Sequence, residues 1–262
     1  DVVTMSELLS SIGLVIEHHR DTKELHITNN GTLQLFAPYE LVERIRASVN
    51  VLGPLLGRFG EVRIALPGGD DFGSRPIDMH LRGLTELGAQ FEMRHGDIYA
   101  RAERLHGTNI TLDFPSVGAT ENLLTAAVFA KGSTSIENAA REPEIGDLCN
   151  MLVAMGAEIE GIGTSNLTIH GVKRLHGATY RVMPDRIEAG SYACAAAITG
   201  GEVRLEGAKA DDMMATIHAL QAIGCDVTWD AKSITVKADG KLKATNLTTA
   251  PYPGLATDMQ AQ

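Results

Sequence analysis

One pattern decides the fold, and it occurs in Leu152-Val153-Ala154-Met155-Gly156-Ala157-Glu158-Ile159-Glu160 and again in Leu220-Gln221-Ala222-Ile223-Gly224-Cys225-Asp226-Val227-Thr228. An apolar helical run ends at a glycine, and an alternation of period two follows it. Glycine is common after a helix because it enters the left-handed conformation without steric cost. A second alternating segment comes later, at Asn166-Leu167-Thr168-Ile169 and at Ser233-Ile234-Thr235-Val236. The pattern predicts helix, strand, turn and strand.

The pattern repeats along the chain. Its glycines are Gly13, Gly88, Gly156 and Gly224, at intervals of 75, 68 and 68 residues. A second set of helices is predicted to end at Gly60, Gly132 and Gly201, at intervals of 72 and 69 residues. We therefore expect an α/β fold built from units of about 70 residues. Consecutive α/β sandwich domains are the alternative.

The helix predicted before Gly201 shows where the helices lie. Its segment, Tyr192-Ala193-Cys194-Ala195-Ala196-Ala197-Ile198, is apolar nearly all round. Such a helix is buried on most sides. We therefore expect buried helices with the sheets outside them.

Composition excludes several classes of protein. The 262 residues carry 23 Lys and Arg against 33 Asp and Glu, a net charge of −10, which argues against general binding of nucleic acid or anionic membranes. No stretch reaches the about 18 apolar residues of a membrane span. Cys149, Cys194 and Cys225 are predicted to be reduced, buried thiols. We expect a cytoplasmic protein.

No metal and no cofactor are expected. The nine histidines show no shared metal-ligand spacing along the sequence. His18-His19 is assigned to a polar turn, where solvation accounts for both side chains.

Six motifs follow one another along the whole chain. They are Ile45-Arg46-Ala47-Ser48, Leu66-Pro67-Gly68-Gly69-Asp70-Asp71-Phe72-Gly73-Ser74-Arg75-Pro76-Ile77-Asp78, Pro115-Ser116-Val117-Gly118-Ala119-Thr120, Asn138-Ala139-Ala140-Arg141-Glu142-Pro143-Glu144, Pro184-Asp185-Arg186-Ile187-Glu188 and Thr257-Asp258-Met259-Gln260-Ala261-Gln262. In this order they resemble the UDP-N-acetylglucosamine enolpyruvyl transferases (1-carboxyvinyltransferases).

The resemblance implies a particular α/β architecture. The family fold has two similar domains, each an inside-out α/β barrel of three βαβαββ units with buried helices and outer sheets. This chain holds fewer than four such units, so we expect a fragment or an unusually short form. Residues 1–183 would be the first domain, truncated at its N-terminus, and residues 184–262 the incomplete start of the second. The family's N-terminal Lys-Asn pair and C-terminal phosphate-binding arginines have no counterpart here.

The resemblance also implies a transferase of peptidoglycan synthesis, with roles in cell wall biogenesis, cell shape and cell division. The family joins the 3′-hydroxyl of UDP-N-acetylglucosamine to carbon 2 of phosphoenolpyruvate, passes through a tetrahedral ketal and expels phosphate. Asp258 matches the family's hydroxyl base. Without the resemblance, Asp258 would be interpreted as a helix cap or first-turn carboxylate.

Asp70 departs from the family pattern. Most members place a cysteine after Pro-Gly-Gly, whereas here Asp70 follows Pro67-Gly68-Gly69. A carboxylic acid can still protonate the methylene carbon if burial or neighbouring Asp71 raises its pKa. The alternative is a solvated glycine turn.

We predict that an intact enzyme with Asp70 resists fosfomycin. The drug alkylates the family's cysteine, and a carboxylate attacks an epoxide far less readily than a thiolate does. Mass spectrometry after fosfomycin treatment is the measurement, and a covalent adduct on residue 70 would contradict the prediction.

The resemblance assigns the remaining substrate contacts. Arg46 and Arg75 match cations that bind phosphoenolpyruvate or phosphate, since a guanidinium binds anions through paired donors. For Arg46, the alternative is an ordinary surface arginine. Arg75-Pro76-Ile77-Asp78 matches the uracil-recognising segment of the UDP-N-acetylglucosamine site. Ser116-Val117-Gly118 matches the diphosphate-binding segment, and Ser116 also fits a helix N-cap.

Three departures and two rival functions qualify the assignment. Phe114, Asn50 and Ala256 replace a lysine, a tryptophan and a proline that are common in the family. One rival is a non-catalytic or inactive nucleotide-sugar-binding fragment, and the other is a shikimate-utilising enolpyruvyl transferase. The charged residues of two further motifs are predicted to form a structural ion-pair framework: Glu142, Glu144, Asp185, Arg186 and Glu188.

Overall fold

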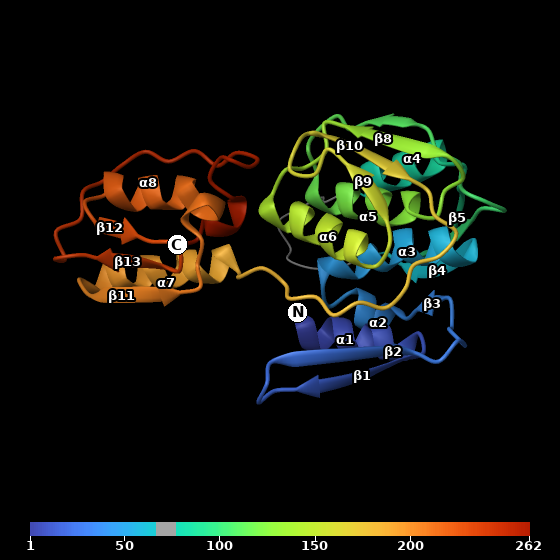
Figure 1. Cartoon of the computed structure of the whole chain (residues 1–262), viewed down its shortest axis with the longest axis horizontal. Helices are drawn as coiled ribbons and strands as arrows, with labels where there is room; N and C mark the ends of the chain where they lie inside the picture. Colours follow the sequence, from blue (N-terminus) through green and yellow to red (C-terminus); the bar gives the residue numbers. More distant parts are fainter. Residues whose placement is uncertain (67–76) are drawn as a thin grey trace. The chain divides into compact units, whose positions relative to one another are not determined.

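The computed structural model describes residues 1–66 and 77–262. The chain forms two compact units (Figure 1). The first comprises Asp1–Ala139 and Cys149–Ala178, and the second comprises Ala140–Leu148 and Thr179–Gln262. The division into two enolpyruvyl transferase domains at 183/184 stays a prediction, because compactness does not assign a domain's identity.

In its described residues, the first unit contains three sheets. Its strands are β1 (Leu14–His19), β2 (Glu24–Asn29), β3 (Phe36–Ala37), β4 (Glu61–Ala65), β5 (Gln90–Arg94), β6 (Asp97–Arg101), β7 (Asn109–Thr111), β8 (Ser133–Glu137), β9 (Glu158–Glu160) and β10 (Asn166–His170). Its helices are α1 (Val2–Ser11), α2 (Tyr39–Val42), the 3-10 helix η1 (Arg46–Val51), α3 (Leu52–Phe59), α4 (Asp78–Glu86) and α5 (Val117–Ala127). Helix α6 (Pro143–Ala154) has residues in both units.

Two of these sheets have the same topology. Their strand orders are β3-β4-β6-β5 and β7-β8-β10-β9. In each, the first pair is parallel, as in Phe36↔Arg63 and Asn109↔Ser135, and the other pairs are antiparallel. Helices separate the strands at corresponding places. In the sheet of β3 to β6, η1 and α3 precede β4 and α4 follows it, and in the sheet of β7 to β10, α5 precedes β8 and α6 follows it. The chain therefore contains two complete βαβαββ units, which confirms the predicted repeat and fold class. Among the described residues, the sheets stay open.

The repeat glycines adopt the predicted conformation. Gly13, Gly88, Gly156 and Gly224 have φ values of 104°, 101°, 101° and 108°. In this region a side chain on an L-residue clashes with the backbone, so glycine ends each first helix.

Two of the three second-helix ends were predicted wrongly. Gly60 caps α3 with φ 78° as expected. Helix α7 (Arg186–Thr199) instead ends with Gly200 in the left-handed conformation, one residue before Gly201. Helix α5 ends at Ala127. Between the helix and Gly132 the chain forms tight turns, in which the Phe129 and Ala130 N–H groups donate to carbonyl oxygens three residues earlier.

Helix α5 forms the centre of the first unit. It packs against α3, α4, η1, β8 and β10. Its buried residues lie all round the helix: Ala119, Thr120, Asn122, Leu123, Leu124, Ala126 and Ala127. A Cβ on Gly53 of α3 would lie 2.2 Å from the Asn122 carbonyl oxygen, so only glycine permits this close approach. The prediction of a buried helix therefore holds for α5.

The second unit contains a smaller sheet. Its elements after α7 are β11 (Glu202–Glu206), the 3-10 helix η2 (Ala210–Met213), α8 (Met214–Ala222), β12 (Asp226–Trp229), β13 (Ser233–Lys237) and the 3-10 helix η3 (Thr257–Met259). The strand order is β11-β13-β12, all antiparallel. Its apolar core joins α7, α8 and this sheet around Ala193, Ile217 and Ile234.

The prediction that α7 is buried on most sides was wrong. Tyr192 and Ile198 of α7 are 58% and 79% exposed. Helix α7 contacts β11, β13, α8, η2 and η3, which cover only part of its surface. An apolar pattern predicts burial only where neighbouring elements are present to cover it.

The prediction of buried thiols holds for Cys149 and Cys225, whereas Cys194 is half-buried. Cys149, Cys194 and Cys225 are free, and burial raises the pKa of each, that of Cys149 to about 11. In the part of the chain that the structure describes, no helix combines the length and hydrophobicity of a membrane span. The assignment of His18-His19 to a turn was wrong, since both residues end β1 and the turn begins at Arg20.

Candidate functional site

The start of α5 is a site suited to anions. Ser116 is its N-cap, and its Oγ accepts a hydrogen bond from the Ala119 N–H at 3.3 Å. Val117 and Gly118 open the helix and are half-buried. First-turn N–H groups lack intrahelical partners and lie at the positive end of the helix dipole. The predicted diphosphate segment therefore has a geometry that attracts negative charge.

His80 of α4 lies directly against this helix start. Its side chain is buried, and a Cβ on Gly118 would lie 3.1 Å from His80 Cε1. The close contact explains why a glycine occupies position 118. Sequence reasoning missed His80, although it lies only two residues beyond the predicted segment ending at Asp78.

Asn122 orients the His80 ring. The Gly53 N–H donates to Asn122 Oδ1 at 2.7 Å, so Asn122 Nδ2 faces His80 Nδ1 at 2.9 Å. The same Nδ2 donates to the Val49 carbonyl oxygen at 3.2 Å. Because an amide nitrogen can only donate, His80 Nδ1 accepts, and the ring is neutral with its proton on Nε2. No local sequence signal singled out Asn122, because Thr120, Glu121 and Thr125 are polar residues of the same helix.

Electrostatics keep His80 neutral. Burial, and to a smaller extent the positive charge of Arg46, lowers its pKa from the ordinary 6.5 to about 4, and Asp78 partly opposes the shift. Arg46 is half-buried at the start of η1, and Asp78 lies exposed in the first turn of α4. The structure therefore gathers Arg46, Asp78 and Gly118 around one neutral imidazole.

The motifs also predicted Ile77, Asp70, Arg75 and Pro76 as site residues of this unit. Ile77 is buried at the N-cap position of α4. Asp70, Arg75 and Pro76 lie outside the described residues, which omit 67–76.

Asp258 lies in the second unit, on η3. It is exposed and lies in the first turn of η3, as its alternative interpretation as a first-turn carboxylate predicted, whereas Ala256 holds the N-cap position. Neighbouring Met259 is buried against Gly190 of α7, where an added Cβ would lie 2.8 Å from Met259 Cε. Within the described ranges, no ion pair or side-chain hydrogen bond engages Asp258. Packing of Met259 thus positions a carboxylate that is left open to solvent.

The whole chain, residues 1–262, matches the family described as "EPSP synthase (3-phosphoshikimate 1-carboxyvinyltransferase)". The chain belongs to this family.

Curated relatives in the EPSP synthase family share much of the sequence. A UDP-N-acetylglucosamine 1-carboxyvinyltransferase of Novosphingobium aromaticivorans is 63% identical over 228 residues, which cover 86% of this chain and 53% of the relative. One of Zymomonas mobilis subsp. mobilis is 51% identical over 100% of this chain and 63% of its own length. The resemblance stated from the motifs is confirmed. The chain spans about half to two thirds of the length of these relatives.

Two solved structures share the fold of this chain. The enolpyruvyl transferase NikO from Streptomyces tendae superposes with a TM-score of 0.84 at 23% identity, covering 98% of this chain and 62% of that one. An EPSP synthase from Acinetobacter baumannii gives a TM-score of 0.69 at 21% identity, covering 98% and 61%. At these identities the likeness establishes the fold.

The predicted ion-pair framework is present only in part in this EPSP synthase family member, because the described residues form one of its ion pairs, between Arg186 and Glu144. Arg186 donates from Nε to Glu144 Oε1 at 2.8 Å and from Nη2 to Glu144 Oε2 at 3.4 Å. Asp185 caps α7 by accepting from the Ile187 and Glu188 N–H groups at 2.8 and 3.0 Å. Glu144 and Asp185 are therefore engaged in structural contacts, whereas Glu142 and Glu188 form no ion pair among the described residues.

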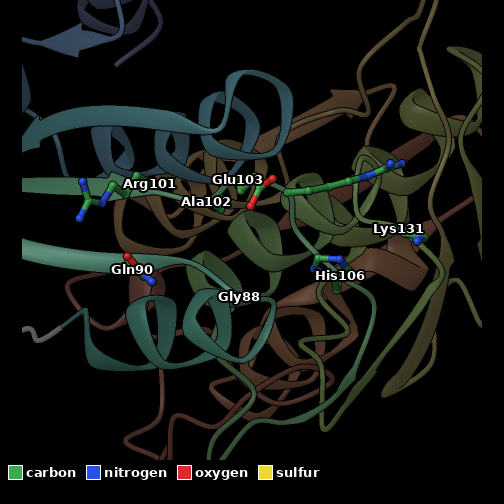
Figure 2. Close-up of a pocket in the computed structure, with 8 residues that line it drawn as sticks. Gly88, Gln90, Arg101, Ala102, Glu103, His106 and Lys131 are labelled. Atoms are coloured by element: carbon green, nitrogen blue, oxygen red, sulfur yellow. The ribbon is translucent and has the colours of Figure 1, made fainter.

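One pocket among the described residues lies away from the predicted site residues. It has a volume of about 720 Å³ and is lined by Gly88, Gln90, Arg101, Ala102, Glu103, Arg104, His106 and Lys131. Figure 2 shows Arg101 pointing away from His106 and Lys131. Because its cations do not converge on a common point, this pocket is a weaker anion site than the start of α5.

Proposed function

We propose that the protein containing this chain transfers the enolpyruvyl group of phosphoenolpyruvate to the 3′-hydroxyl of UDP-N-acetylglucosamine and releases phosphate. This is the first committed step of peptidoglycan synthesis. The name of the curated relatives supports the reaction. The observation in the structure that carries the proposal is the grouping of Arg46, neutral His80 and the start of α5, which suits a substrate with a diphosphate.

The first unit supplies substrate binding. Ser116, Val117 and Gly118 would receive the diphosphate of UDP-N-acetylglucosamine through backbone N–H groups. Arg75, Pro76, Ile77 and Asp78 would bind the uracil.

Two arginines would bind the second substrate. Arg46 and Arg75 would hold the phosphate or carboxylate of phosphoenolpyruvate through paired N–H donors. Because burial keeps His80 neutral beside Arg46, the imidazole orients neighbouring groups and adds no charge of its own.

Two carboxyl groups would move the protons. Asp258 takes the proton from the sugar hydroxyl as it attacks carbon 2 of phosphoenolpyruvate, and Asp70 donates one to the methylene carbon. The exposed Asp258 carboxylate, left without an ion-pair partner among the described residues, is available to a substrate hydroxyl. The proposal includes a cytoplasmic location, roles in cell shape and division, and the fosfomycin resistance expected from Asp70.

The test is a phosphate-release assay on the full-length protein with phosphoenolpyruvate and one of two acceptors. We expect turnover with UDP-N-acetylglucosamine and none with shikimate 3-phosphate, because curated relatives 51–63% identical to this chain are named for the former. Turnover with shikimate 3-phosphate alone would contradict the choice of substrate. Calorimetric binding of UDP-N-acetylglucosamine without phosphate release would identify a nucleotide-sugar-binding module instead.

A further inference from the structure

The hairpin of β1 and β2 brings four potential metal ligands to one face. The two strands pair antiparallel, with Glu17 opposite His26 and His19 opposite Glu24. Alternate residues of a strand share a face, and directly opposed residues have neighbouring Cβ atoms. The register therefore places Glu17, His19, Glu24 and His26 together, far from the predicted substrate-binding residues in sequence.

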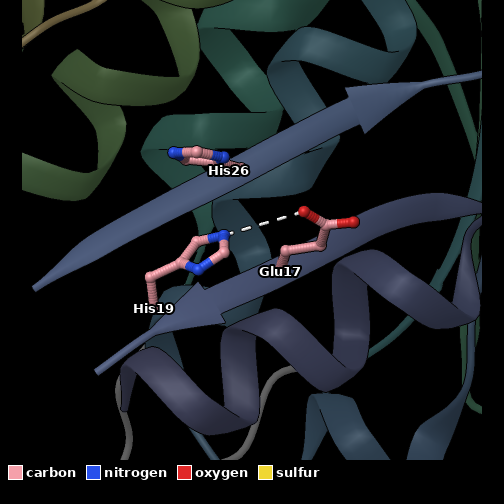
Figure 3. Close-up of side chains that lie close together, drawn as sticks. All are labelled: Glu17, His19 and His26. Carbon is pink, nitrogen blue, oxygen red and sulfur yellow. Dashed lines mark ion pairs between the residues drawn. The ribbon is translucent and has the colours of Figure 1, made fainter. Parts of the chain in front are cut away.

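Three of these side chains are grouped closely enough to share a cation. One ligand atom each from Glu17, His19 and His26 lies within 4.8 Å of the other two. Figure 3 shows Glu17 and His19 on one strand with His26 across from them, and His19 Nε2 lies 3.7 Å from Glu17 Oε2. The two imidazole rings are tilted, with centroids 4.5 Å apart.

The separations are close to those of a bound metal. Tetrahedral zinc ligands at about 2.0–2.2 Å from the ion lie about 3.3 Å from one another. All three side chains are exposed, so small rotations about their χ angles can shorten the observed separations without disturbing a core.

The chemistry of these ligands selects a class of ion. Two imidazole nitrogens and one carboxylate oxygen suit Zn²⁺ and neighbouring divalent transition metals, whereas Ca²⁺ and Mg²⁺ prefer oxygen alone. Glu24 Oε2 lies 3.7 Å from His26 Nε2, so a second carboxylate stands beside the cluster. Two carboxylates also balance the charge of a divalent cation.

We propose that Glu17, His19 and His26 bind a divalent transition metal of the zinc class, with water in the fourth position. The ion would link β1 to β2. A two-stranded sheet is marginally stable by itself, so a cross-strand metal stabilises the folded hairpin. The spacing along the sequence does not reveal the site, because two ligands come from one strand and the third comes from the next.

Isothermal titration calorimetry with ZnCl₂ tests the site on this chain, prepared without a histidine tag and dialysed against a chelator. We expect one equivalent to bind with micromolar affinity. His19→Ala and His26→Ala should each weaken binding by at least about tenfold, because each removes a ligand. His18→Ala is the matched control, since His18 lies on the opposite face of β1 and should leave the affinity unchanged.

Two results would overturn the proposal. One is the absence of Zn²⁺ binding at millimolar concentration. The other is binding that both His19→Ala and His26→Ala retain, which would place the ion elsewhere, for example on a thiol. Circular dichroism checks that the variants fold. Slower amide hydrogen exchange in β1 and β2 on addition of Zn²⁺, abolished by His26→Ala, is the expected independent signature.

Discussion

Replacing Asp258 by asparagine is expected to lower kcat of the full-length enzyme by about 10²- to 10⁴-fold, the usual contribution of a general base. An amide cannot accept the proton of the sugar hydroxyl at neutral pH. The fold should survive, because Met259 packing against Gly190 positions η3 and the Asp258 carboxylate is exposed. Phosphate release at saturating substrates measures the effect.

Binding separates a chemical role of Asp258 from a structural one. UDP-N-acetylglucosamine should bind Asp258→Asn with nearly unchanged affinity in calorimetry, since the amide keeps the shape of the side chain. Asp226→Asn, at another exposed aspartate of the second unit, is the matched control and should keep full activity. An Asp258→Asn enzyme with unchanged kcat would exclude Asp258 as the base.

His80 should make the first unit less stable as pH falls from about 6.5 to about 4. Its pKa is about 4 in the folded protein and 6.5 when unperturbed. Between these values the unfolded chain binds a proton that the folded chain does not, so the free energy of unfolding falls with pH. Protonation of His80 in the unfolded chain lowers the free energy of unfolding by up to about 3 kcal/mol. The full decrease is reached only below pH 4, and above pH 6.5 this contribution no longer varies with pH.

Urea denaturation across this pH range tests the effect by comparison with His80→Gln. The glutamine carbonyl can still accept from Asn122 Nδ2 but does not titrate, so the variant should lose this part of the pH dependence. His106→Gln changes an exposed histidine of the same unit and should behave as the unaltered chain does. Identical pH dependence in all three proteins would mean that His80 is not held neutral.

The sequence predicted the repeating architecture well because its signals are local. A glycine after an apolar helix and a period-two strand involve neighbouring residues, so Gly13, Gly88, Gly156 and Gly224 could be identified without any structure. Helix ends failed where local signals were ambiguous. Gly200 and Gly201 are adjacent, and only the backbone conformation shows that Gly200 takes the left-handed position.

Motifs identified the family and the start of α5, but they did not reveal how the site is held together. Residues 116–118 and Arg46 could be selected by resemblance. The network joining His80, Asn122 and Gly53 could not, because its hydrogen bonds connect residues 42 and 69 positions apart.

Composition, glycine spacing and motif order were enough to establish an α/β repeat of the enolpyruvyl transferase type, because each depends on the order of residues along the chain. Tertiary packing decided the exposure of Tyr192 and Ile198, the neutral state of His80 and the grouping of Glu17 with His26. Burial and pKa depend on all surrounding groups. A cross-strand pair depends on the strand register, and a shift of one residue would move one of the side chains to the opposite face of the sheet.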